Sequence, residues 1–73
     1  MAAKSTLREQ LEHIEQAVGE PVMRCAAYRR RNIFILGDDS AVLLAKSNRV
    51  DVFTTLLQAT QAIDSNPDMF PYN

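Results

Sequence analysis

The sequence predicts a small α+β domain in which two helices pack on a short antiparallel sheet. Three features indicate this fold: helical spacing of apolar residues near the start, two apolar runs separated by a turn sequence, and a second helical pattern beyond residue 48. A chain of 73 residues is too short for more than one core, so we expect a single domain over 1–73. The expected order is α-β-β-β-α, with α-α-β-β-α as the alternative.

Residues 6–18 are expected to form the first helix. Thr6 and Glu9 have the spacing of a capping box, in which each residue satisfies a backbone N–H of the other. Gly19 and Pro21 follow as typical signals of a helix end. The apolar side chains lie on one narrow stripe formed by Leu7, Leu11, Ile14 and Val18.

Residues 22–45 are expected to form antiparallel strands. Residues 22–28 are ambiguous, because Pro21 also suits the first turn of a helix, but we favour a strand. Residues 33–36 and 41–45 are apolar runs of strand length. The Gly-Asp-Asp-Ser sequence between them is typical of a turn, and a hairpin follows.

Residues 48–64 are expected to form the second helix, with Ser47 or Asn48 as its N-cap. Apolar residues recur there at helical spacing and cover a wide arc. Residues 65–73 form a tail with two prolines and the aromatic residues Phe70 and Tyr72. We expect this tail to pack on its own domain or on a second copy of the chain.

The apolar surface is larger than one narrow helix stripe can cover. Alternation along the hairpin places apolar side chains on both faces of the sheet, whereas a solvated face would be polar. Two helices could cover both faces within one chain, but a homodimer or an obligate partner is the favoured interpretation. The expected interface residues are Phe34, Leu36, Leu43, Val52, Phe53 and Leu56.

A basic spot stands out in a chain of net charge −1. Arg29, Arg30 and Arg31 follow one another, with Tyr28 directly before them. Arginine recognises phosphate and carboxylate groups through its forked donors, so these residues are candidates for binding. We expect them at the exposed turn end of the sheet. The candidate binding residues are Tyr28, Arg29, Arg30, Arg31, Phe70 and Tyr72.

The other polar and ionisable residues of the sequence argue against catalysis and metal binding. No nucleophile, acid and base can be assembled from the sequence, so we expect no enzyme, no cofactor and no metal site. One cysteine excludes an internal disulfide, and no apolar run approaches the roughly 20 residues that span a bilayer, so a cytoplasmic protein without membrane association is expected.

The sequence therefore favours a non-catalytic interaction or regulatory protein that binds another protein, as a homodimer. The alternative is a nucleic-acid-binding regulator that uses Arg29, Arg30 and Arg31. It is less favoured because the rest of the chain is acidic overall, whereas nucleic-acid binders usually carry further basic residues along one face.

Overall fold

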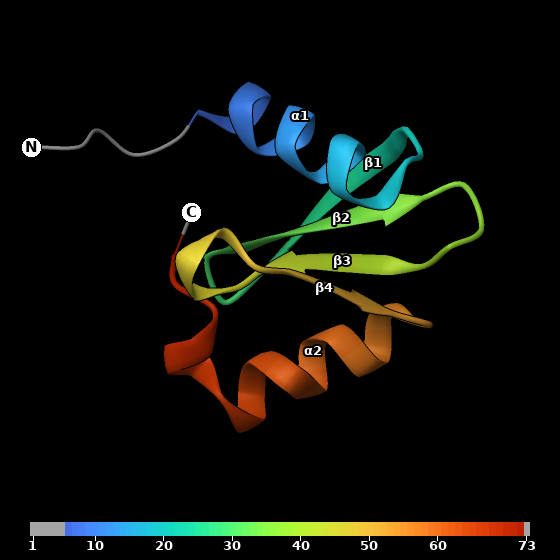
Figure 1. Cartoon of the computed structure of the whole chain (residues 1–73). Helices are drawn as coiled ribbons and strands as arrows, with labels where there is room; N and C mark the ends of the chain where they lie inside the picture. Colours follow the sequence, from blue (N-terminus) through green and yellow to red (C-terminus); the bar gives the residue numbers. More distant parts are fainter. Residues whose placement is uncertain (1–5, 73) are drawn as a thin grey trace, which may run out of the picture.

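The computed structural model describes residues 6–72, which form an α+β domain (Figure 1). Four strands form one antiparallel sheet in the order β1-β2-β3-β4, with a helix before and a helix after it. The predicted class and the order of helix, strands and helix are confirmed, and residues 22–28 are a strand. The elements are α1 (Leu7–Val18), β1 (Val22–Tyr28), β2 (Arg31–Leu36), β3 (Ala41–Leu44), β4 (Val50–Phe53) and α2 (Leu56–Ser65).

Helix α1 begins and ends where the sequence predicts. The Thr6 hydroxyl accepts from the Glu9 N–H at 3.2 Å, and the Glu9 carboxylate accepts from the Thr6 N–H at 2.9 Å. Gly19 takes the left-handed conformation (φ 74°) that ends many helices. Ile14 is the helix residue that is fully buried against the sheet.

The sheet lies between the two helices, so the domain has three layers (Figure 1). On the α1 side, Ile14 packs with Phe34, Leu36 and Val42. On the α2 side, Ala59 and Ile63 pack with Ile33, Ile35, Ala41, Leu43, Ala45 and Phe70. Each helix therefore covers one apolar face of the sheet.

This arrangement corrects part of the expected interface. Phe34, Leu36 and Leu43 are at most 3% exposed within the single chain. Two helices of one chain are enough to bury both faces of the hairpin, because α1 packs closely through Ile14 despite its narrow stripe. These three side chains therefore offer a partner almost no surface.

The second correction concerns the predicted helix over residues 48–64. Its first part is strand β4, and α2 begins only at Leu56, after the N-cap Thr55, whose hydroxyl accepts from the Gln58 N–H. A short turn over Lys46–Asn48 leads from β3 into β4, with Ser47 and Asn48 in the left-handed region (φ 62° and 60°). That turn reverses the chain and makes Val50–Phe53 the outer strand of the sheet.

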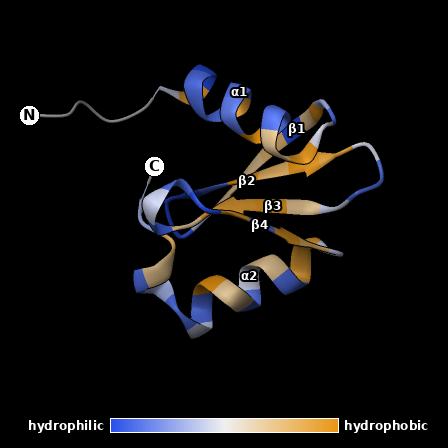
Figure 2. Cartoon of the chain, viewed as in Figure 1, coloured by the Kyte–Doolittle hydropathy of each residue, from blue (hydrophilic) through white to orange (hydrophobic). Residues whose placement is uncertain are grey.

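Figure 2 shows that hydrophilic residues gather on the outer sides of the helices, whereas β2 and β3 are largely hydrophobic. Within residues 6–72, neither helix has the length and apolar character needed to cross a membrane.

Candidate functional site: a basic cluster at one end of the sheet

The turn between β1 and β2 consists of two arginines. Tyr28 pairs with Arg31 across the turn, and the residues between them, Arg29 and Arg30, have φ values of 49° and 67°. Two positive φ angles are typical of a type I′ turn, which favours Asn-Gly. Each left-handed non-glycine residue costs about 1–2 kcal/mol. Backbone strain of this kind concentrates at functional sites, which directs attention to this end of the sheet.

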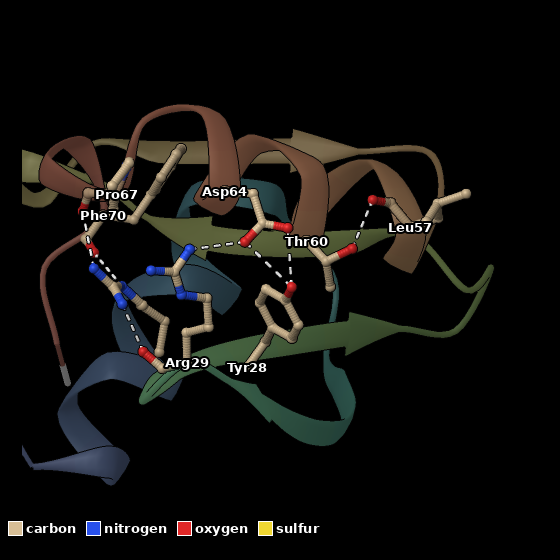
Figure 3. Close-up of polar contacts among 8 residues, drawn as sticks. Tyr28, Arg29, Leu57, Thr60, Asp64, Pro67 and Phe70 are labelled. Carbon is tan, nitrogen blue, oxygen red and sulfur yellow. Dashed lines mark hydrogen bonds and ion pairs between the residues drawn. The ribbon is translucent and has the colours of Figure 1, made fainter.

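Asp64 at the end of α2 holds the first side of the turn. Its carboxylate accepts from the Arg29 guanidinium at 2.8 Å and from the Tyr28 hydroxyl at 2.9 Å (Figure 3). The hydrogen bond from Arg29, and then that from Tyr28, holds the pKa of Asp64 below its ordinary value. The same carboxylate raises the pKa of Tyr28. The charge of Arg29 is therefore matched by a carboxylate of α2.

Arg31 is buried, at 7% exposure. Its Nε donates to the Phe70 carbonyl at 2.7 Å, and its two terminal nitrogens donate to the carbonyls of Arg29 and Pro67 at 2.6 and 3.1 Å. The expectation that all three arginines lie at an exposed turn end is wrong for Arg31. The C-terminal tail folds over its side chain and supplies backbone carbonyls as partners.

The tail packs on its own domain. Phe70 is 4% exposed and belongs to the core on the α2 side of the sheet. The Tyr72 ring lies beside the guanidinium groups of Arg30 and Arg31. The ring centroid is 4.4 Å from Cζ of Arg31 and 4.8 Å from Cζ of Arg30. Such cation–π contacts stabilise a cation over an aromatic ring. The six candidate binding residues therefore lie together at one end of the sheet.

A cavity of about 400 Å³ opens within this basic cluster. It is lined by Arg31, Lys46, Pro67, Asp68, Pro71 and Tyr72. The sequence analysis missed Lys46, which belongs to the turn between β3 and β4. In a meander, the first and third turns lie at the same end of the sheet, so recognising β4 would have placed Lys46 beside the arginines.

A second surface lies at the opposite end, beside strand β4. A groove of about 380 Å³ has an apolar floor that includes Val18, Leu36 and Val52, and Glu20 and Asp38 also line it. Of the predicted interface residues, Val52 and Leu56 are 54% and 40% exposed, whereas Phe53 is partly buried against the core of the α2 side.

Residues of catalytic or metal-binding type are scattered. Within residues 6–72, no three side chains among His, Cys, Asp and Glu converge on a possible metal position. The His13 ring is engaged with the Asn48 carbonyl at 2.8 Å, and Cys25 is exposed on β1.

Comparison with protein families, with curated proteins and with solved structures found no match to this chain.

Proposed function

We propose that this chain is a non-catalytic interaction protein that binds an extended segment of a partner protein along strand β4. The observation that carries the proposal is the combination of an open sheet edge with an apolar groove beside it. An exposed strand edge is a template for another strand, and the side chains of the added strand enter neighbouring pockets.

The hydrogen-bonding pattern of β4 supports strand addition. Within residues 6–72, strand β4 pairs with β3 alone, with Val52 opposite Val42 and Val50 opposite Leu44. The Ala45 N–H donates to the Arg49 carbonyl at 2.7 Å in the same register. Since bonded and non-bonded pairs alternate in an antiparallel ladder, the N–H and C=O groups of Val50 and Val52 point away from β3. They therefore face outward, where an incoming strand can pair with them.

The two sheet edges differ in a way that favours β4. Strand β1 carries an irregularity in its register between Val22 and Arg24, and such irregularities discourage pairing at an edge. Strand β4 keeps a regular register with β3 over all four of its residues. An incoming strand therefore finds a regular template at β4.

The groove also indicates the chemistry of the partner segment. The apolar side chains of Val50 and Val52 share one side of β4 and line the groove together with Glu20 and Asp38. An added strand would place alternate side chains over this floor. Apolar residues at those positions and a lysine or arginine near the two carboxylates match the surface best.

The test is a titration of the isotope-labelled protein with a short peptide of alternating valine and lysine, followed by NMR. We expect chemical-shift changes that saturate and that centre on β4 and the end of α1. The same peptide with glutamate in place of lysine should bind more weakly, because its charges face Glu20 and Asp38. Equal shifts with both peptides, or shifts spread over the molecule, would refute the proposal.

Val52→Lys is the informative variant, because it replaces an exposed apolar residue in the groove by a charge. Leu57→Lys is the matched control, since Leu57 is also exposed, at 65%, but does not line the groove. Only the first should lose peptide binding. If light scattering gives the wild type a dimer mass that Val52→Lys reduces to a monomer mass, the groove holds a second copy of the chain and the partner assignment is wrong.

A further inference from the structure

Arg31 carries a buried positive charge that no carboxylate within residues 6–72 matches. Its partners there are three backbone carbonyls and the Tyr72 ring. Buried charged groups are usually paired with an opposite charge, because removing an ion from water costs several kcal/mol. A guanidinium has five N–H donors. Three of the five donate to the carbonyls, so each terminal nitrogen of Arg31 keeps one N–H group that none of these carbonyls uses.

The surroundings of Arg31 add further positive charge. Lys46 lines the same cavity, and Arg30 lies over the Tyr72 ring that forms one of its walls. Neither has an ion-pair partner in the described part of the chain, where the two salt bridges are those of Arg29 with Asp64 and of Arg49 with Asp51. Against these three cations stands one lining carboxylate, Asp68. Among residues 6–72, positive charge is therefore in excess around the cavity.

We infer that this cavity binds the phosphate group of a small phosphorylated molecule. Arg31 would donate its remaining N–H groups to the phosphate oxygens, and Lys46 would supply a second cation from the turn between β3 and β4, at the same end of the sheet. A planar guanidinium fork matches phosphate geometry, and a lysine adds a compact charge. The cavity is open to solvent, and its volume of about 400 Å³ leaves room for a phosphate group and part of the molecule that carries it.

The walls indicate what the rest of the ligand looks like. Pro67 and Pro71 offer apolar surface, and the Asp68 carboxylate can accept from a hydroxyl or amino group. A phosphate ester with a polar, partly apolar body, such as a nucleoside monophosphate, meets these conditions. The strain of Arg29 and Arg30 is consistent with a turn retained for recognition, because the same reversal with Asn-Gly would cost less.

This site is independent of the proposed strand-binding groove, because the two lie at opposite ends of the sheet. The groove lies beside the turn between β2 and β3, and the cavity lies beside the turns on either side of that one. Either proposal can be refuted without affecting the other, because the two sites share no residue and are tested with different ligands and different variants.

The test is an NMR titration of the full chain with inorganic phosphate and with adenosine monophosphate, with sodium chloride at matched ionic strength as the control. We expect saturable shifts at the amides of residues 30, 31, 46, 68–70 and 72 with both phosphates and not with chloride. Adenosine monophosphate should bind more tightly than inorganic phosphate, because its nucleoside contacts the proline walls. Shifts that chloride reproduces would overturn the inference, as would tighter binding of inorganic phosphate.

Lys46→Gln is the principal variant, because Lys46 is exposed and its replacement should leave the fold intact. It should weaken binding of adenosine monophosphate roughly tenfold, the usual effect of losing one charge-assisted hydrogen bond. Arg30→Gln should weaken binding as well. Arg24→Gln removes the same charge from an exposed position on β1 outside the cavity and should leave the affinity unchanged. Equal affinity in Lys46→Gln and Arg24→Gln would refute the site.

A single-stranded oligonucleotide separates this inference from a nucleic-acid surface. If the cavity binds a small phosphorylated molecule, adenosine monophosphate should displace any bound oligonucleotide. If instead the oligonucleotide binds with a steep salt dependence and adenosine monophosphate does not compete, the basic cluster is a nucleic-acid surface and the inference is wrong.

Discussion

Arg30 and Arg31 are neighbours in the sequence, yet they have opposite environments. Arg31 is buried and donates three hydrogen bonds, whereas Arg30 is exposed and lies over the Tyr72 ring. Because hydrogen bonds from a charged group contribute more than neutral ones, we expect Arg31→Ser to lower the free energy of unfolding by about 3 kcal/mol. Arg30→Ser should change it by less than about 0.5 kcal/mol.

Urea denaturation of both variants measures this difference. Equal unfolding midpoints for Arg31→Ser and Arg30→Ser would mean that the carbonyl contacts of Arg31 do not stabilise the fold. The triplet would then be the solvated turn that the sequence alone predicts.

Asp64 gives the domain a pH dependence in acid. Its pKa is lowered in the folded state by Arg29 and Tyr28 from an ordinary value of 3.8. A group with a lowered folded pKa contributes its stability above the unfolded pKa and loses it as the pH falls through the folded value. The wild type should therefore lose more stability than Asp64→Asn as the pH drops below about 4.

This prediction is tested by measuring the thermal unfolding of the wild type and of Asp64→Asn from neutral pH down to pH values below the pKa of Asp64. The pKa of Asp38 is also lowered, by hydrogen bonds from Ser40. Its contribution is common to both proteins, so the difference between them isolates Asp64. Parallel pH profiles would show that the Asp64 contacts do not persist in solution.

Among the secondary-structure elements, helix α2 has a start that is fixed by its N-cap, Thr55. Its hydroxyl accepts from the Gln58 N–H at 3.2 Å, and the Gln58 side chain accepts from the Thr54 N–H at 3.0 Å. Loss of a threonine N-cap usually costs about 1 kcal/mol, so Thr55→Ala should lower the stability by that amount. Thr54→Ala is the control, because Thr54 takes part through its backbone. Equal losses in chemical denaturation would mean that the cap lies elsewhere.

The sequence did not distinguish strand β4 from helix α2, because the apolar residues in this region fit both the spacing of a helix and the alternation of a strand. Val50, Phe53 and Leu57 have helical spacing, while Val50 and Val52 alternate with Asp51 as in a strand. A strand of four residues is too short for alternation to outweigh the helical pattern. The Thr55 cap was the available signal, but Asn48 offered an equally plausible one. Helix α1, with a capping box, a stripe and a glycine stop, had no such competitor.

At the scale of the whole molecule, the sequence predicted which residues form the basic cluster but not how they are held. Tyr28 and the arginines are adjacent in the chain, so their grouping needs no tertiary information. The burial of Arg31 depends on carbonyls 36 and 39 residues away, at Pro67 and Phe70. Lys46 lines the cavity because the order of the strands places the turn between β3 and β4 beside the turn between β1 and β2. Contacts of this kind follow from the topology and leave no local pattern.

The sequence argument for a homodimer rested on apolar residues on both faces of the hairpin, for which coverage by two helices of one chain was the less favoured alternative. Phe34, Leu36 and Leu43 are now accounted for by the two helices. Val52 and Leu56 remain exposed, and the groove beside β4 is where a partner of any kind would find apolar surface. The homodimer stays a prediction, and the case for it is limited to that edge of the sheet.

The last prediction concerns the tail, which connects the core with the basic cluster. Phe70 is 4% exposed among Ile33, Ile35 and Ile63, and its carbonyl accepts from Arg31. Phe70→Ala should therefore lower the free energy of unfolding by about 3–5 kcal/mol, a large part of the roughly 5–15 kcal/mol that stabilises a typical domain. Tyr72→Ala should cost less than about 1 kcal/mol, because the ring is 54% exposed and contributes mainly its cation–π contacts.

Denaturant titrations of the two variants decide whether the tail belongs to the folded domain. If Phe70→Ala is as stable as the wild type, the tail is an appendage and the cavity lined by Pro67, Asp68, Pro71 and Tyr72 does not persist. If it is strongly destabilised while Tyr72→Ala is not, Phe70 anchors the tail. Pro67 and Asp68 lie between α2 and Phe70, so releasing them from the cavity requires removing Phe70 from the core. Pro71 and Tyr72 follow Phe70 and depend on their own contacts, such as that of the Tyr72 ring with Arg31.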